Sequence, residues 1–495
     1  MPSRNFARIV YVPFDQLNSN HGALKHVNKD SDLVLLVESD RMVNPQKYHP
    51  QRLFFLVSSA RHFAAALRSD GYNVSYVRDA TTEQGIRDAM STYPEATLFA
   101  AEQSSYRLQA TLGALGASFC PNDFFLTERQ SFIEWAQSQK SYLMENFYRR
   151  QRLRLNILVD GDKPVGGAWN FDKDNREPLP KQYDFAPYVE HERDELDREV
   201  ADELGVSMSG TWATTRAGAL NQLREFLSQH FENFGRYEDA MSSTNWAVHH
   251  SLLSPYINNG LLHPKEVVDA ALERFEEGGI PIASCEAFIR QIIGWREYIN
   301  GMYWHLGESY RENNGLKATR TLLPLYSDPS ATQMNCVKSV ISDIQERSWV
   351  HHIPRLMVLS NLALIAGVNP QEYLEWMRES FIDAFDWVMV PNVIGMGVHA
   401  DSGLMMTKPY AAGGAYISRM SDYCKGCVFD PKKRSGDTAC PFTTLYWDFL
   451  DRHAEEFSRN HRMFQQIAGL RRLSDLDEVR ARAKTVLQKL EEGTL

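Results

Sequence analysis

ARIVYV at residues 7–12 opens a series of short apolar runs, which continues with DLVLLV (32–37), LFFLV (53–57), YNVSYV (72–77) and ATLFAA (96–101). Helical patterns lie between them, one starting at Ser58 and another near Glu83. This alternation predicts a parallel sheet with helices on both faces, because strands covered on both sides are apolar throughout. We therefore expect residues 1–130 to form a Rossmann-like, doubly wound α/β domain. The GxGxxG fingerprint is absent after the first strand, which removes the usual reason to propose a nicotinamide dinucleotide.

The rest of the chain divides into a connection and a helical domain. Residues 131–205, above all from Leu155 onward, are rich in Pro, Asp, Glu and Lys and are predicted to join the two domains. Residues 206–495 have helical spacing in segments such as ALNQLREFLSQHF (219–231) and PRLMVLSNLALIAG (354–367), and strand signals are scarce. The expected second domain is large and all-α.

Composition sets the broad class. The chain has 495 residues, of which 43% are hydrophobic and 23% charged, as in ordinary globular proteins of more than one domain. Its apolar stretches are shorter than the roughly 20 residues that cross a bilayer, so we expect a cytoplasmic protein. The net charge of -10 decides little about nucleic acids, because DNA binding depends on a local basic patch.

Four of the six cysteines suggest a metal site. Cys424 and Cys427 form a CxxC, Cys440 follows 13 residues later, and Cys336 lies 88 residues before Cys424. Four thiolates suit tetrahedral zinc or an iron-sulfur cluster, and the spacing does not separate the two. A purely structural CxxC with two unrelated cysteines is the third reading. Cys120 and Cys285 stand alone and are expected to be buried, inert thiols.

Six segments together carry a family resemblance. The chain resembles the iron-sulfur bacterial cryptochromes and photolyases, most closely the bacterial (6-4) photolyases, in GGAWNFDKDNR (166–176), HHSLLSPYINNGLL (249–262), FIRQIIGWREYINGMYW (288–304), HHIPRLM (351–357), VPNVIGM (390–396) and KPYAAGGAYISRMSDYCKGC (408–427). The resemblance implies an N-terminal antenna domain and a helical domain that holds FAD. It also implies a [4Fe-4S] cluster on Cys336, Cys424, Cys427 and Cys440, in preference to zinc.

The resemblance also assigns a flavin site. It implies that FAD phosphates bind near a helix N-terminus, that an arginine and an acid flank the ring system, and that a polar group lies near the flavin N5. The residues expected there are Ser251, Leu252, Leu253, Ser254, Trp295, Arg355, Asp383 or Asp386, and Asn392. Without the resemblance, SLLSPY would be an ordinary helix cap and the two acids would form a surface salt bridge. Whether Trp295 or Arg296 faces the flavin stays open.

Repair of a (6-4) photoproduct needs an electron from the flavin and a proton for the lesion. His352 matches the family histidine and His351 precedes it, whereas Leu356 replaces the second histidine of related eukaryotic enzymes. Tyr410 and Tyr416 match tyrosines of the lesion pocket. Basic residues between Met405 and Arg434 are expected to bind DNA phosphates, and they are Lys408, Arg419, Lys432, Lys433 and Arg434, with Lys425 nearby.

The family antenna is 6,7-dimethyl-8-ribityllumazine, and its expected contacts are Phe14, Asp15, Gln16 and Glu38, with Phe14 in the place of a glycine. Photoreduction in the family starts at an aromatic residue that Trp376 matches. Met377 and Asp328 interrupt that route, so Trp349, Tyr303 or Trp304 are alternatives.

The sequence thus predicts a monomeric enzyme that repairs (6-4) photoproducts in UV-damaged DNA, with light-excited FAD as electron donor and His352 as proton donor. A blue-light signalling cryptochrome with the same cofactors is the second hypothesis. A zinc-stapled DNA-binding protein without photochemistry is the third.

Overall fold

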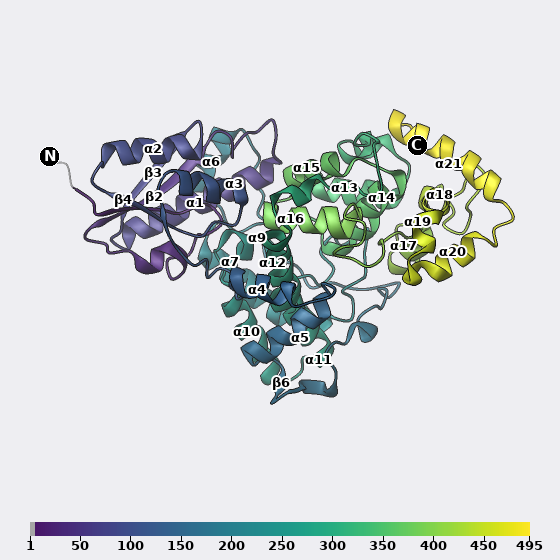
Figure 1. Ribbon diagram of the computed structural model, residues 1–495, viewed down its shortest axis with the longest axis horizontal. Helices are drawn as coiled ribbons and strands as arrows, with labels where there is room; N and C mark the ends of the chain where they lie inside the picture. Colours follow the sequence, from purple (N-terminus) through teal and green to yellow (C-terminus); the bar gives the residue numbers. More distant parts are fainter. Residues whose placement is uncertain (1–4) are drawn as a thin grey trace.

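The computed structural model describes residues 5–495 and opens with a five-stranded sheet. All neighbouring strands run parallel, in the order β3-β2-β1-β4-β5. Figure 1 shows this sheet at one end of the molecule, with the helical remainder extending away from it. The strands are β1 Arg8–Tyr11, β2 Asp32–Ser39, β3 Asn73–Asp79, β4 Thr97–Ala101 and β5 Ser118–Cys120. The predicted α/β domain followed by a mostly helical region is confirmed.

Helices cover both faces of the sheet. On β2, whose residues are all buried, Val34 and Leu36 pack with the residues of α1 (Pro50–Ser69). Leu33 and Leu35 point the opposite way and pack with α2 (Thr82–Thr92) and α3 (Tyr106–Ala114). Because successive side chains of a strand alternate between faces, the middle of a strand that is covered on both sides is apolar at consecutive positions, as at residues 33–37.

The apolar run LFFLV (53–57) is not separate from the helix predicted to start at Ser58. Helix α1 already begins at Pro50, where His49 accepts a hydrogen bond from the backbone of Gln51 and a proline occupies the first turn. Phe54 and Val57 pack against α6 (Glu195–Leu204), while other residues of the run face the sheet. This part of α1 is buried on two sides, so it lacks the polar stripe that marks a surface helix.

The predicted connection, residues 131–205, contains regular structure. Helices α4 (Arg129–Gln137) and α5 (Met144–Leu155) pack against α12 (Glu297–Leu306) of the helical part, whereas α6 packs on α1 beside the sheet. A short hairpin, β6 Val159–Asp160 with β7 Lys163–Pro164, lies between them. The chain from 131 to 205 therefore contacts both parts of the molecule, and the domain limits stay a prediction.

The regular structure of the remaining residues is helical, with long loops between the helices (Figure 1). The further α-helices are α7 Arg216–Glu225, α8 Phe231–Phe234, α9 Ser254–Asn259, α10 Pro264–Glu276, α11 Ile282–Ile289, α13 Asn335–Arg347, α14 Asn361–Ala366, α15 Pro370–Ser380, α16 Asp386–Val390, α17 Gly414–Met420, α18 Pro441–Arg452, α19 Ala454–Ser458, α20 Phe464–Leu470 and α21 Leu476–Glu492. Four π-helical segments interrupt the series, namely η4 Phe226–His230, η5 Arg290–Arg296, η9 Pro354–Ser360 and η10 Pro391–Gly397. Within residues 5–495, no helix is long and apolar enough to cross a membrane.

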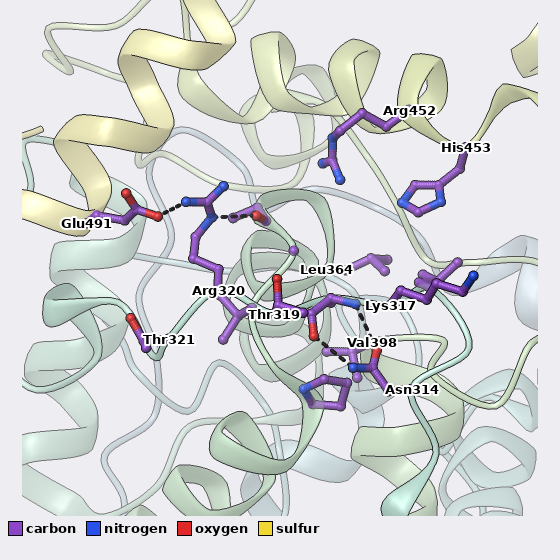
Figure 2. A pocket seen from close by; sticks show the side chains of 16 residues that line it. Asn314, Lys317, Thr319, Arg320, Thr321, Leu364, Val398, Arg452, His453 and Glu491 are labelled. Atoms are coloured by element: carbon purple, nitrogen blue, oxygen red, sulfur yellow. Dashed lines mark hydrogen bonds and ion pairs between the residues drawn. The ribbon is translucent and has the colours of Figure 1, made fainter.

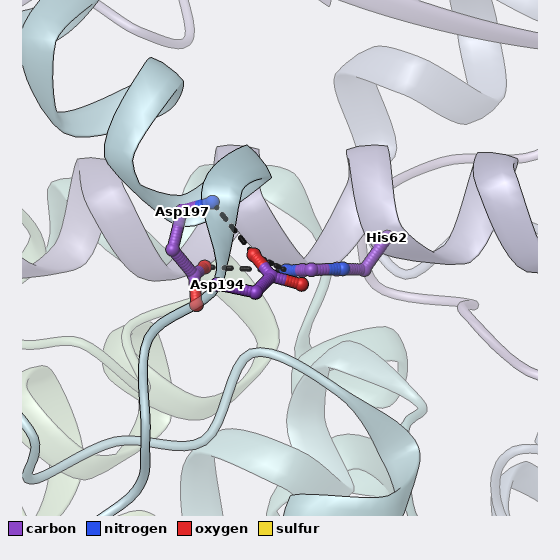
Figure 3. Close-up of side chains that lie close together, drawn as sticks. All are labelled: His62, Asp194 and Asp197. Carbon is purple, nitrogen blue, oxygen red and sulfur yellow. Dashed lines mark hydrogen bonds and ion pairs between the residues drawn. The ribbon is translucent and has the colours of Figure 1, made fainter.

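A histidine and two aspartates join α1 to the start of α6 (Figure 3). His62 Nε2 lies 3.3 Å from Asp197 Oδ1 and 3.5 Å from Asp194 Oδ1. Asp194 caps α6, and Asp197 also accepts a hydrogen bond from Thr214. The guanidinium of Arg193 lies 3.7 Å from Asp197. This cation offsets the charge of Asp197, and the hydrogen bonds and ion pairs of the group hold the two helices together.

Candidate functional site

A cavity of about 260 Å³ lies inside the helical part. Its wall is built from segments far apart in the sequence. From the predicted flavin and lesion sites it includes Ser251, Leu252, Leu253, Ser254, His351, His352, Arg355, Asp383 and Asn392. The structure therefore brings together nine of the residues that the sequence singled out for these sites.

Three π-helical segments contribute to this wall. η5 supplies Gln291, η9 supplies Arg355 and η10 supplies Asn392. A π-helical turn inserts an extra residue into a helix and redirects the side chains after it, which is why such turns are common at functional sites.

Residues 251–253 form a strained turn before α9, which begins at Ser254. Leu252 has a φ of 59°, a left-handed conformation that is rare for a bulky side chain and costs on the order of 1–3 kcal/mol. Ser254 donates to Asp383 Oδ2 at 2.6 Å and accepts from the indole of Trp349 at 3.2 Å. The Ser254 hydroxyl thus already donates and accepts a hydrogen bond within the protein. Ser251 is therefore the serine better able to bind a phosphate oxygen.

Arg355 and Asp383 form a buried, two-bond ion pair on the wall. Asp386, the other predicted acid, pairs instead with Arg378 at 2.6 Å and does not line the cavity. The two acids separate because Asp386 is the first residue of α16, whereas Asp383 precedes that helix. Asn392 lines the cavity and donates to the carbonyl oxygen of Val388 at 2.8 Å.

Three histidines lie on the same wall. The rings of His250 and His351 stack with centroids 4.1 Å apart. His351 is buried, its Nδ1 has no partner within residues 5–495, and burial lowers its pKa. His352 is accessible from the cavity but surrounded by protein, and this desolvation, together with Arg355, lowers its pKa to about 4. Its imidazole is therefore uncharged near neutral pH until an anion binds beside it.

Tyr410 and Tyr416 lie outside the cavity wall. The hydroxyl of Tyr416 bonds to Asp239, and burial raises the pKa of both tyrosines. Arg419 lies over the Tyr416 ring, with 5.6 Å between its guanidinium carbon and the ring centroid. The two tyrosines thus belong to a charged rim that includes Asp172 and Arg176.

The basic stretch is largely exposed. Lys408, Arg419, Lys432 and Lys433 are exposed, as a surface that contacts phosphates requires. Arg434 differs, because its Nε lies 2.8 Å from Asp475 and its charge is already neutralised. Four of the five predicted DNA contacts therefore remain candidates on geometric grounds.

Trp295 does not line the cavity. It packs edge-on against Tyr298, with ring centroids 6.0 Å apart. Its neighbour Arg296 pairs with Glu297 at 3.0 Å and lies over the ring of Phe125. Gln291 of the same segment reaches the cavity instead, because η5 is π-helical and shifts the helix face. Glu238 and Trp349 also line the cavity. Glu238 was not predicted from the sequence, and Trp349 was predicted only as an alternative residue of the electron path.

The four predicted cluster ligands line one enclosed space. Cys336 lies in the first turn of α13, Cys440 precedes α18, and Cys424 and Cys427 lie in the loop after α17. Gly414 approaches so closely that a Cβ there would lie 2.7 Å from the sulfur of Cys440. The six cysteines of the chain are free thiols, and Cys120 and Cys285 are buried elsewhere.

The spacing of these thiols bears on the choice of metal. In a tetrahedral zinc site with Zn–S bonds of about 2.3 Å, the sulfurs lie about 3.8 Å apart. Within residues 5–495, no three cysteine sulfurs lie within 4.8 Å of one another. The four thiols thus share one space but are not drawn together as a bound zinc ion would draw them.

The predicted antenna residues lie at the carboxyl ends of β1 and β2. Phe14 is buried and stacks on Tyr76, with ring centroids 6.2 Å apart. Glu38 accepts hydrogen bonds from Tyr76 at 2.6 Å and from Arg61 at 3.0 Å. Burial raises the pKa of Asp15 to about 6.

Asp15 and Gln16 also have partners in the protein. Asp15 accepts a hydrogen bond from Ser104, and Gln16 donates to the carbonyl oxygen of Glu102 at 3.1 Å. All four predicted residues therefore have partners of their own, and Glu38 in particular ties β2 to α1.

Trp376 is buried behind the cavity. Its indole donates to the carbonyl oxygen of Tyr326 at 3.1 Å, while Met377 takes the position on the wall. Trp349 does line the cavity, and its ring lies 5.5 Å from that of Trp246, which is half-buried. Trp349 and Trp246 thus place two neighbouring indole rings between the cavity and a half-buried position.

A second cavity, of about 410 Å³, lies near the C-terminal helices (Figure 2). Arg320 pairs with Glu491 and donates to the carbonyl oxygen of Ala366 at 3.0 Å. Arg452 donates to Asp448 at 2.8 Å and to the carbonyl oxygen of Ile365 at 2.6 Å. Both arginines thus satisfy carbonyl groups at the C-terminus of α14, a structural role that accounts for their presence.

Known proteins with this architecture are photolyases and cryptochromes. A crystal structure of a bacterial class III photolyase from Agrobacterium tumefaciens matches 99% of this chain and 98% of its own, with a TM-score of 0.58 and 16% identity. The structure of the Synechocystis sp. PCC6803 cryptochrome matches 85% of this chain and 89% of its own, with a TM-score of 0.57 and 15% identity. These similarities establish the photolyase and cryptochrome fold.

Sequence comparison is more specific. The family model of deoxyribodipyrimidine photo-lyase-related proteins matches residues 10–216. A protein of Agrobacterium fabrum named (6-4) photolyase is 40% identical over 507 aligned residues, which cover 98% of this chain and 100% of the relative. The chain therefore belongs to the (6-4) photolyase family, within the photolyases and cryptochromes.

Proposed function

We propose that this protein repairs (6-4) pyrimidine-pyrimidone photoproducts in DNA, using light and a bound FAD. One observation carries the proposal: the cavity joins the Arg355–Asp383 pair to His351 and His352, in a chain similar over its whole length to a protein named (6-4) photolyase. A flavin next to an imidazole is the combination that transfer of an electron and a proton requires.

The wall suits a flavin on several counts. It combines the hydroxyl of Ser251, the strained backbone at Leu252 and an orphaned nitrogen on His351 with apolar side chains such as Met396. Ligand sites are mostly apolar with a few placed polar groups, as here. We propose that residues 251–253 bind the phosphates and that Arg355, Asp383 and Asn392 flank the ring system.

When bound, FAD supplies the light-excited electron donor. Arg355 carries a positive charge that stabilises a reduced, anionic ring system, and Asp383 holds Arg355 in place. An anion beside His352 raises its pKa from about 4, which lets the imidazole take up the proton that it then delivers to the lesion.

We further propose a [4Fe-4S] cluster on Cys336, Cys424, Cys427 and Cys440, supported by their convergence on one enclosed space. A lumazine antenna near Phe14, Asp15, Gln16 and Glu38 remains part of the proposal. So do photoreduction through Trp376 and DNA contacts by Tyr410, Tyr416 and the exposed basic stretch.

The test is illumination of the purified protein with DNA that contains either a (6-4) product or a cyclobutane dimer. We expect restoration of the (6-4) product alone, and loss of this restoration in His352→Ala without loss of FAD. Flavin-loaded protein that restores neither lesion would instead support the signalling alternative.

A further inference from the structure

Glu238 is an acid on the cavity wall that the proposed function leaves unused. It lies four residues after the end of α8. Its Oε1 accepts a hydrogen bond of 2.6 Å from Nε2 of Gln291, which also lines the cavity. Its backbone carbonyl accepts from Nε2 of His250 at 3.2 Å, and His250 in turn stacks on His351. Glu238 thus belongs to the same connected wall as the two adjacent histidines.

The charges around Glu238 favour its uncharged form. Asp172, Asp239 and Glu286 are the neighbouring acids. Arg290, the nearby cation, pairs with Asp172 and lies 3.3 Å from Glu286, so its charge is shared.

A second arginine, Arg176, lies 3.9 Å from Asp239. Arg419 also acts on Asp239, and Arg152 acts on Glu286, so these cations serve the acids around Glu238. Burial and the excess of acids raise the pKa of Glu238 to about 8. Near neutral pH its carboxyl carries a proton, while Gln291 occupies Oε1 and leaves Oε2 to hold it.

A neutral carboxyl offers what a damaged pyrimidine needs. Pyrimidine rings present carbonyl oxygens, which accept hydrogen bonds, and an added electron increases the negative charge on them. A donor that is already in place stabilises such charge more than water does, because nothing must reorganise during the reaction. The Tyr416–Asp239 hydrogen bond places one predicted lesion contact next to Glu238 in the chain.

We propose that the carboxyl of Glu238, positioned by Gln291, donates a hydrogen bond to a carbonyl oxygen of the damaged pyrimidine and stabilises the negative charge that the transferred electron places there. The inference rests on the proposed function, since it assumes that a pyrimidine lesion enters this cavity. It adds a catalytic residue to the same site and assigns Gln291 as a positioning residue.

The test compares Glu238→Gln and Glu238→Ala in flavin-loaded protein, with Glu232→Gln as the control at an exposed acid six residues away. Glu238→Ala should lower the rate of (6-4) repair about 10²-fold at saturating DNA, whereas Glu238→Gln keeps an N–H donor and should lose less than about tenfold. Wild-type repair should fall as the pH rises through about 8, because the donor proton is lost, and Glu238→Gln should lack this fall.

A readout independent of repair is the infrared carbonyl band of a protonated carboxylic acid in protein without DNA. This band should be present below pH 8, disappear at higher pH, and be absent in Glu238→Gln. Equal repair by wild type and a folded, flavin-loaded Glu238→Ala would overturn the inference and leave the proposed function intact. An unchanged band in Glu238→Gln would also overturn it. If wild type restores no (6-4) product, the proposed function itself fails.

Discussion

Arg355 and Asp383 meet in two parallel hydrogen bonds on the cavity wall, with Nη1 2.9 Å from Oδ1 and Nη2 3.1 Å from Oδ2. Both side chains are largely buried, at 15% and 7% exposure. Ser254 adds a third bond to the same carboxylate, so the pair fixes the turn before α9 against the segment before α16. The geometry of the proposed flavin site therefore depends on one acid.

Replacement of Asp383 by Asn should release this arrangement. Breaking a buried ion pair leaves an uncompensated charge and costs about 3–5 kcal/mol. We expect a free energy of unfolding lower by up to this amount and a much lower ratio of FAD to protein. Denaturant titration and flavin absorption measure the two effects.

The matched control is Asp386→Asn, at the neighbouring acid that pairs with Arg378 outside the cavity. This variant should retain full flavin content. Equal flavin loss in both variants would mean that the Arg355–Asp383 pair has no special role in holding the cofactor.

The cysteines provide a prediction about metal content. Protein prepared without oxygen should contain about four irons per chain if the four clustered thiols hold a [4Fe-4S] cluster. Cys336→Ser should lose iron and stability together, because α13 would no longer be tied to the loop after α17. Cys285→Ser, at a buried thiol outside the group, should keep its iron. Stoichiometric zinc in place of iron would contradict the assignment.

Sequence patterns predicted the architecture because its cause is local. Residues 33–37 of the run DLVLLV are all apolar because both faces of β2 are covered, and that requirement is visible in the sequence. LFFLV misled the assignment of helix boundaries because α1 is buried between the sheet and α6, a tertiary contact that no local pattern reveals.

Sequence motifs predicted those residues of the site that belong to them. HHIPRLM and HHSLLSPY were recognised, and their residues converge on one cavity. Periodicity did not separate Asp383 from Asp386, because the choice depends on which arginine each acid meets in the folded chain. Helical periodicity did not predict that Gln291 lines the cavity, because a π-helical turn shifts the face of its helix. Glu238 was not predicted either, because its role depends on acids that are distant in the sequence.

The proposed antenna site provides a further prediction, at Asp15. Asp15 is buried and has a raised pKa, so Asp15→Asn should preserve its volume while removing the charge that a ribityl chain or a ring nitrogen would meet. We expect denatured wild type to release FAD and a lumazine, and Asp15→Asn to release FAD with less lumazine.

Asp15→Asn is a cleaner variant than Glu38→Ala, which would also break the contacts to Arg61 and Tyr76. Chromatography of the released pigments distinguishes the outcomes. FAD alone, from wild type made in a lumazine-producing host, would indicate that the Phe14 and Tyr76 rings fill the site.

The central claim is that light absorbed in this cavity drives repair of the lesion. An action spectrum tests it most directly: (6-4)-containing DNA is incubated with flavin-loaded protein at a series of wavelengths, and restored DNA is counted per incident photon. The account predicts that restoration follows the absorption of the bound, reduced flavin, extended only by an antenna, and that none occurs in the dark. Restoration in darkness, or a failure of flavin-loaded protein to restore the (6-4) product at every wavelength, would contradict it.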